Sequence, residues 1–161
     1  MSVSTRLEVL KRLTNFLKTI TVANGYSHDL STSVFRGRAV FGTDDPVPLV
    51  SILESPRSDI GQFAGENERK ESWGLLIQGW AYDDINNPTD PAYELMADVE
   101  AHLDRLTACS PINGQELYPD DYLLGRTIAN MRVSSGVVRP PMEGVSSKAF
   151  FYLPVSLTLV K

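Results

Sequence analysis

The segment of residues 73–83 restricts the fold of this chain more than any other. Its side chains alternate between two sets, and a period of two residues is typical of a β-strand. Both sets contain large apolar residues, with Trp73 in one and Trp80 in the other. One face of the strand is expected to meet helices. The other face then needs a cover, because a large exposed apolar surface usually marks an interface. The residues expected on that second face are Phe35, Trp80, Phe151 and Leu153.

Two segments carry apolar residues at helical spacing. In residues 5–24, apolar side chains recur three or four positions apart at Leu7, Leu10, Leu13, Leu17 and Ile20. Thr5 and Glu8 fit a capping box, and Asn24-Gly25 suits a helix end. The second helix is expected over residues 90–107, since Asp90 can cap it and Pro91 suits its first turn.

Four further segments have strand character: residues 33–41, 49–54, 126–138 and 149–160. The strands 49–54 and 73–83 predict a hairpin with a long loop at residues 56–71. Pro154 favours an edge position or a bulge for the last strand. The resulting order, α-β-β-β-α-β-β, predicts a single α+β domain over residues 1–161. A mixed or antiparallel sheet of four to five strands would carry both helices on one face.

Composition excludes several classes of protein. The net charge of -5 argues against a basic nucleic-acid-binding face. The single cysteine, Cys109, allows no intramolecular disulfide and is expected to be a small packing group. No apolar run approaches the roughly 20 residues of a membrane span, and the first residues do not form a signal peptide. We therefore expect a soluble protein that is made in a cytoplasm and does not contact a membrane.

The residues that could perform chemistry are few and scattered. His28 and His102 are expected in surface or capping roles, and two histidines with one cysteine make a poor zinc set. The acidic pairs Asp44-Asp45, Asp83-Asp84 and Asp120-Asp121 fall in turns, where aspartate is favoured by local hydrogen bonding. No nucleophile elbow, phosphate loop or dinucleotide fingerprint occurs. We therefore expect no catalytic residue, metal or cofactor.

Interface candidates come from strand faces and loops. Arg36 and Arg38 are expected on one strand face, either solvated or paired with Glu54 of a neighbouring copy. A stiff turn after the fourth strand carries two more candidates, and the charged loop at 56–71 supplies the rest. Together with Trp80, these loop and turn candidates are Arg57, Asp59, Phe63, Glu66, Arg69, Arg139 and Met142.

The layout resembles the tail terminator family of long-tailed bacteriophages, the group that includes the lambda minor tail protein U. The resembling stretches are the opening helix with Leu17-Lys18-Thr19-Ile20, then Asn24-Gly25-Tyr26, Ser33-Val34-Phe35-Arg36-Gly37, residues 48–54, residues 73–82 and residues 150–155. The resemblance covers most of the chain and rests on an arrangement of elements, since no catalytic signature accompanies it.

The resemblance implies a structural virion protein without enzymatic activity. Such proteins form a ring, expected to contain six copies, at the head-proximal end of the tail tube. They stop tube polymerisation and dock the head connector. The implied partners are further copies of the chain, the tail tube protein and the head–tail connector, while DNA passes through the channel.

Three other functions stay open at this point. The chain could be another neck component, such as a head-completion or tail-to-head joining protein. A small metal-dependent hydrolase would use Asp83, Asp84 and His102. A cytoplasmic binding module would need a cavity between the sheet and the helices.

Overall fold

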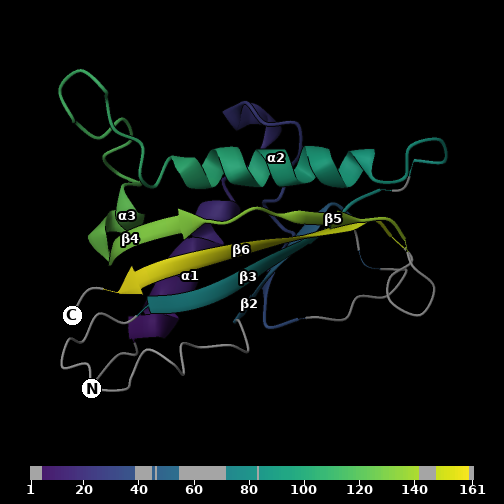
Figure 1. Cartoon of the computed structure of the whole chain (residues 1–161), viewed down its shortest axis with the longest axis horizontal. Helices are drawn as coiled ribbons and strands as arrows, with labels where there is room; N and C mark the ends of the chain where they lie inside the picture. The colour runs from purple at the N-terminus through teal and green to yellow at the C-terminus, as the bar shows by residue number, and fades with distance from the viewer. Residues whose placement is uncertain are drawn as a thin grey trace.

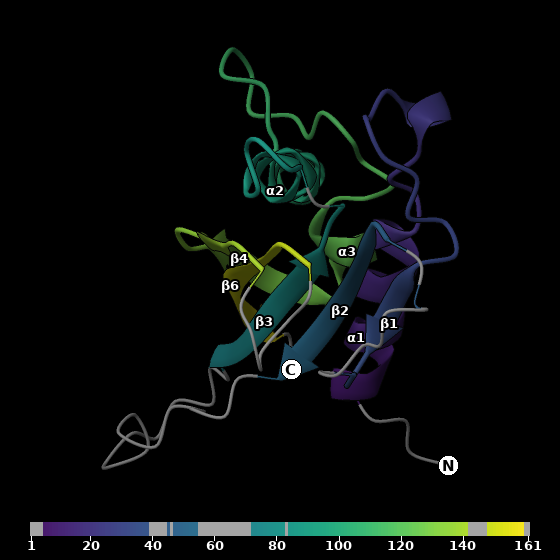
Figure 2. The ribbon, with the colours of Figure 1, turned by 90° about the vertical axis from the view of Figure 1, so that its right-hand side faces the viewer.

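A mixed six-stranded sheet with two main helices on one face confirms the predicted α+β class (Figures 1 and 2). The computed structural model describes residues 5–38, 45, 47–54, 72–82, 84–141 and 148–159. Its elements are α1 (Thr5–Leu17), the 3-10 helix η1 (Val22–Asn24), β1 (Val34–Arg36), β2 (Leu49–Glu54), β3 (Ser72–Trp80), α2 (Asp90–Asp104), α3 (Leu123–Arg126), β4 (Ile128–Val133), β5 (Val137–Arg139) and β6 (Phe150–Leu159).

The strand order is β1-β2-β3-β6-β4, and β5 also pairs with β6. β1 lies parallel to β2, whereas the other pairs are antiparallel. The predicted hairpin between β2 and β3 is confirmed by a register that runs from Leu49 opposite Trp80 to Glu54 opposite Leu75. Its connecting loop, residues 56–71, lies outside the described residues.

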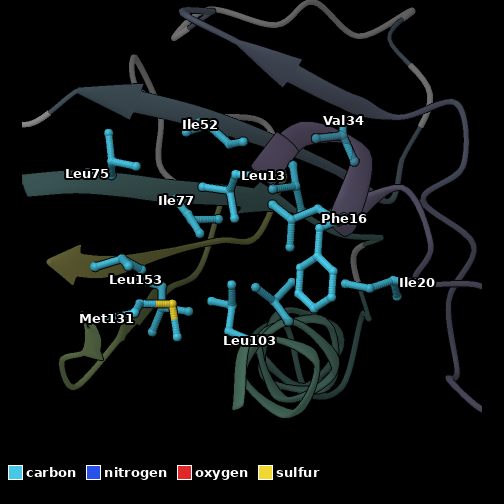
Figure 3. Packing of buried hydrophobic residues seen from close by; sticks show 14 of the residues in the cluster. Leu13, Phe16, Ile20, Val34, Ile52, Leu75, Ile77, Leu103, Met131 and Leu153 are labelled. Atoms are coloured by element: carbon cyan, nitrogen blue, oxygen red, sulfur yellow. The ribbon is translucent and has the colours of Figure 1, made fainter. Parts of the chain in front are cut away.

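The main core fills the space between the sheet and the helices (Figure 3). α1 contacts β1 and α3, while α2 contacts β3, β5 and β6. In Figure 3, Phe16 reaches from α1 toward α2, and Ile52, Ile77 and Leu153 rise from the strands to meet them. The helical spacing of leucines in α1 thus supplies one wall of the core, and the strand alternation supplies the other.

α1 is shorter than predicted and ends at Leu17. Tighter three-residue hydrogen bonds, Thr19 N to Phe16 O and Ile20 N to Leu17 O, both 3.1 Å, close its last turn. The predicted stop at Asn24-Gly25 instead ends η1, where Gly25 has a left-handed φ of 96°. α2 begins at Asp90, the predicted place, but Asp90 is its first helical residue and Thr89 precedes it as the cap, so the capping role expected for Asp90 is wrong. The helix ends at Asp104, three residues before the predicted end.

The predicted strand at residues 126–138 is divided into β4 and β5, which brings the sheet to six strands. Val133 pairs with Val155, and Val137 pairs with Tyr152. The chain therefore advances by four residues between these pairs while β6 advances by three, which shifts the register by one residue. Pro154 lies at this irregularity, where its carbonyl accepts from Ser134 N at 2.9 Å. The missing N–H of Pro154 is therefore tolerated in a strand that is paired on both sides. Of the two places expected for Pro154, the edge position is wrong, and the register shift agrees with the bulge.

The second sheet face is made by different residues of β6 than predicted. Trp80 pairs with Phe150, and residues directly opposite each other share a face. Phe151 and Leu153 consequently belong to the helix-facing core, and their expected place beside Trp80 is wrong. The prediction assigned β6 the opposite alternation, and a one-residue error moves every side chain to the other face.

Candidate functional site

The predicted interface residues do not gather in one place. Arg36 pairs in register with Ile52, two residues before Glu54, so Arg36 and Glu54 lie at the same end of neighbouring strands of one chain. Both are exposed. Arg139 is exposed too, but it pairs with Phe150 at the opposite end of the sheet. Six of the candidates lie outside the described residues: Arg57, Asp59, Phe63, Glu66, Arg69 and Met142.

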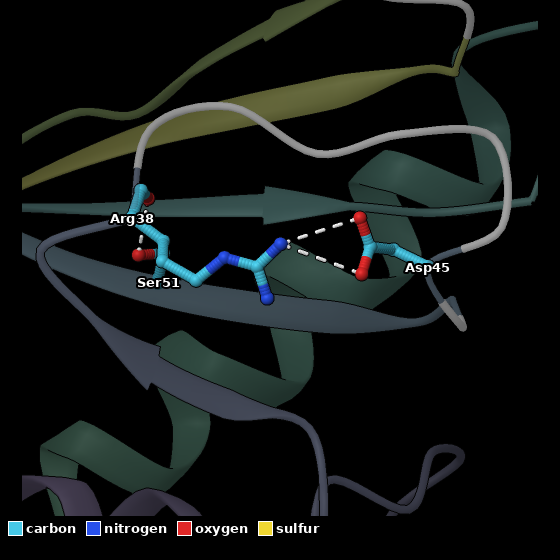
Figure 4. Close-up of polar contacts among 3 residues, drawn as sticks. All are labelled: Arg38, Asp45 and Ser51. Atoms are coloured by element: carbon cyan, nitrogen blue, oxygen red, sulfur yellow. Dashed lines mark hydrogen bonds and ion pairs between the residues drawn. The ribbon is translucent and has the colours of Figure 1, made fainter.

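Arg36 and Arg38 do not share a strand face, contrary to the prediction. β1 ends at Arg36, and Gly37 takes a left-handed φ of 73°, which breaks the alternation. The Arg38 guanidinium instead lies 5.0 Å from the Phe35 ring and 3.3 Å from the Asp45 carboxylate. Figure 4 shows this ion pair across the sheet from α2, with Ser51 Oγ donating to the Arg38 carbonyl at 2.6 Å.

Trp80 lies in a small second core on that face of the sheet. It packs with Leu49 and Phe150, and the three side chains are 7%, 0% and 3% exposed. Phe35 and Tyr152 pack around them and are partly buried. The second face therefore contains a buried cluster, and Trp80 itself is not the open patch that the sequence suggested.

His102 is buried, although a surface or capping role was expected. Its side chain is 1% exposed, and its ring stacks on Phe16 with centroids 4.0 Å apart. Nε2 lies 2.8 Å from both the Phe16 carbonyl and Thr19 Oγ, and Nδ1 lies 2.7 Å from Tyr26 Oη. A carbonyl can only accept, so Nε2 carries the proton and Nδ1 accepts from Tyr26.

This arrangement holds His102 neutral and ties α2 to the segment after α1. Burial lowers the pKa of His102, although the hydrogen bond to the Phe16 carbonyl acts in the opposite direction. The sequence contained a signal for this burial, because position 102 continues the apolar stripe through Val99 by a step of three. Both ring nitrogens are engaged within the fold, so His102 presents no free ligand atom.

His28 also joins the segment after α1 to α2, but closer to the surface than His102. Its Nδ1 lies 2.7 Å from Asp98 Oδ2 on α2, and both side chains are 15% exposed. The same carboxylate oxygen accepts from Ser27 N at 3.0 Å. Asp29, the neighbour considered for a dyad, accepts instead from Ser31 N at 2.9 Å. His28 therefore serves to hold the loop after η1 onto α2.

A hairpin arm, residues 108–117, projects from the body beyond the C-terminal end of α2 (Figures 1 and 2). Cys109 and Glu116 form its bridge, and Ser110 N donates to Gln115 O at 2.7 Å. At its tip, Ile112 is 93% exposed. Cys109 is exposed as well, so its expected packing role is wrong. The Asn113-Gly114 pair was the sequence signal for this hairpin, since Gly114 takes the left-handed φ of 71° that such turns need.

A surface pocket lies beside the base of this arm, between α1 and the segment leading into α3. Its volume is about 310 Å³, near the lower end of the range for ligand sites. Polar and apolar side chains share its lining: Arg12, Asn15, Phe16, Thr19, Asp120, Asp121, Leu124 and Gly125. The pocket is open to solvent and does not match the internal cavity that a small-molecule binding module would need.

The wall of the pocket at α3 is a left-handed turn. Leu123, Leu124, Gly125 and Arg126 have φ values of 51°, 52°, 69° and 66°. This conformation costs roughly 1–2 kcal/mol for each residue other than glycine. Strained backbone of this kind persists where the surroundings fix it and is concentrated at functional sites. Here the N–H of Leu123 donates to the Leu106 carbonyl at 2.8 Å, and Arg126 forms an ion pair with Glu116 of the arm.

The two hydrolase candidates that the structure describes, Asp84 and His102, bond to different parts of the fold. Asp84 Oδ1 accepts from Asn86 N and Asn87 N at 2.9 and 3.0 Å, which is the turn role expected for aspartate. Asp83 lies outside the described residues. Within the ranges that the structure covers, no group of three histidine, cysteine or acidic side chains could hold a metal ion. No helix in those ranges is long and apolar enough to cross a membrane.

Comparison with models of known protein families gives no match for this chain, and comparison with curated proteins gives none either.

Proposed function

We propose that this protein is a structural virion subunit that closes the head-proximal end of a phage tail tube as a ring. In this role it stops tube polymerisation and provides the docking surface for the head connector. The observation that best supports the proposal is the placement of exposed large apolar side chains at both ends of α2. Those at the start are Tyr82, Ile85 and Tyr93; those after its end are Ile112, Leu117 and Tyr118.

Two separated contact groups suit a ring subunit. α2 has 15 residues and is therefore roughly 22 Å long, so the groups lie at well-separated positions. Each subunit of a closed ring contacts one neighbour on either side through two different surfaces. Isolated exposed apolar residues are ordinary, but Ile85 at 97% and Ile112 at 93% exposure are extreme for side chains of this type. Contacts with other copies, the tube protein and the connector would cover them.

The proposal is tested by polymerising the tail tube protein of the same virus with and without this protein and measuring tube lengths by electron microscopy. Substoichiometric amounts should stop elongation. Ile85→Asp should weaken this effect, whereas Val22→Asp should not, because Val22 is 65% exposed on η1, outside both groups. Equal tube lengths with and without the protein would contradict the proposal.

Virions assembled without the protein separate the two neck functions. Loss of a terminator should give overlong tails. Loss of a head-completion or joining protein should give tails of normal length and heads that leak DNA. Tails of normal length in such particles would rule out the terminator role and would favour a head-completion or joining role.

A further inference from the structure

We propose that the tip of the hairpin arm of one copy, residues 110–115, inserts into the pocket between α1 and α3 of the next copy. The inference rests on the proposed ring function and names the contact that would close the ring. Each chain contains one tip and one pocket, at different positions. A contact of this kind is head-to-tail, and repeated head-to-tail contacts generate a ring when the rotation closes.

The tip is shaped before any partner binds. Gly114 N donates to Ser110 O at 2.9 Å, Ile112 N to Ser110 Oγ at 3.2 Å and Gln115 N to Asn113 Oδ1 at 3.1 Å. Little conformational entropy would therefore be lost when the tip is bound, which favours affinity. Ile112 stands at the apex, 93% exposed, so it does not enter the pocket of its own chain.

The base of the arm is fixed as firmly as its tip. The Arg105 guanidinium lies 4.1 Å from the centre of the Tyr118 ring, and Arg126 pairs with Glu116. Leu117 N donates to the Ala108 carbonyl at 3.0 Å. Because Arg126 also belongs to the left-handed turn, the arm and the pocket wall are held by a shared contact.

The pocket fits the tip in size and in chemistry. At about 310 Å³ the pocket is large enough for one or two side chains and too small for a helix about 10 Å across. Phe16 and Leu124 give it an apolar floor for Ile112, and both are buried. Arg12, Asn15 and Asp121 at its wall can bond the outward N–H and C=O groups of a turn.

The tip is uncharged, which suits insertion into a neighbouring subunit. Residues 110–115 contain no charged side chain. Burying the tip would therefore place no unpaired charge in the neighbour, which is the largest penalty that such an insertion could incur. The charged residues that line the pocket are Arg12, which pairs with Glu8 at 3.0 Å, and the carboxylates Asp120 and Asp121.

Two variants test the contact from its two sides. Ile112→Asp places a carboxylate at the apex, and Asn15→Arg fills the pocket from an exposed position of α1. Each should weaken self-association by about tenfold or more, because both act at the centre of the proposed contact. Val22→Asp, an equally drastic change at an exposed position elsewhere, should leave association unchanged. Sedimentation velocity over a range of concentrations measures all four proteins, alone and with tail tubes.

A mixture of the two variants gives a sharper result. Ile112→Asp keeps a working pocket and Asn15→Arg keeps a working tip, so one good contact remains between them. The mixture should therefore form a mixed dimer at concentrations at which neither variant associates alone, and absence of this dimer would count against the contact between tip and pocket. Assembly of both single variants as in the unchanged protein would overturn the inference.

A cross-link identifies the contact on the assembled ring. In a Cys109→Ser background, Ile112→Cys together with Asn15→Cys should give interchain products with a short bis-maleimide once tube ends are present. Tube ends that are closed normally by this variant, without interchain products, would reject the inference and leave the terminator role intact. Failure of the unchanged protein to close tubes would reject the proposed function itself.

Discussion

Replacing His102 by Gln should remove a specific pH dependence from the stability of this protein. In the folded state, burial holds the pKa of His102 below its ordinary value of about 6.5, while in the unfolded chain the ring titrates near 6.5. Acidification therefore protonates the unfolded chain first. The stability contributed by the neutral ring is complete above about pH 6.5 and is lost progressively as the pH falls toward the folded-state pKa.

The magnitude follows from the two protonation equilibria. Each pKa unit of difference corresponds to about 1.4 kcal/mol. Between pH 7.5 and pH 5.5, the unchanged protein should lose up to about 1.4 kcal/mol more of its free energy of unfolding than His102→Gln does. The variant should also lose about 2–3 kcal/mol at pH 7.5, because the stacking on Phe16 and the bond to Tyr26 disappear from a side chain that is 1% exposed.

Urea unfolding at both pH values, followed by tryptophan fluorescence, measures the difference. Comparison of the two proteins cancels the contributions of the groups that the substitution leaves unchanged. Parallel pH profiles for the two proteins would refute the reasoning, because they would mean that His102 does not change its protonation on folding. His102→Phe is the matched control for shape, since it keeps an aromatic ring against Phe16 and cannot titrate.

Three further perturbations test the packing. Gly79→Ala should destabilise the protein by about 1–3 kcal/mol or more in urea unfolding, because an added Cβ would lie 2.0 Å from the Phe151 ring; unchanged stability would contradict the register of β3 and β6. Trp80→Ala should lower the free energy of unfolding by about 3–5 kcal/mol, and a loss below 1 kcal/mol would show that the second cluster is not packed. Asp98→Asn should cost about 1 kcal/mol through its bonds to His28 and Ser27, and hydrogen exchange should increase at Ser27; unaltered exchange there would argue against that contact.

The sequence predicted the elements well wherever a periodic pattern was long. The leucine spacing of α1, the Asp90-Pro91 start of α2 and the alternation in β3 each reflect a local rule that the fold does not override. β6 is located correctly but the prediction gives it the wrong face: its alternation shows that Leu153, Val155 and Leu157 share one side, but not which side meets Trp80. Only the pairing of Trp80 with Phe150 decides which of its residues face the helices.

The candidate contact site was the least predictable part. The arm and the pocket come from residues 108–126, a stretch with little periodicity, where the structure depends on single hydrogen bonds and on backbone that non-glycine residues rarely adopt. Asn113-Gly114 indicated a turn, but no local signal indicates that Leu123 and Leu124 are left-handed. Likewise, the role of His102 depends on Tyr26, which is far away in the sequence and adjacent only after α1 and α2 have packed.

The central proposal is that copies of this chain close a tail tube as a ring. Electron cryomicroscopy of tail tubes incubated with the protein tests it most directly, by imaging the tube ends and counting the added subunits. We expect one closed ring at a single end of each tube, with six copies and with the arm of each copy against α1 of the next. Tubes with bare ends, or with the protein bound along their length, would contradict it.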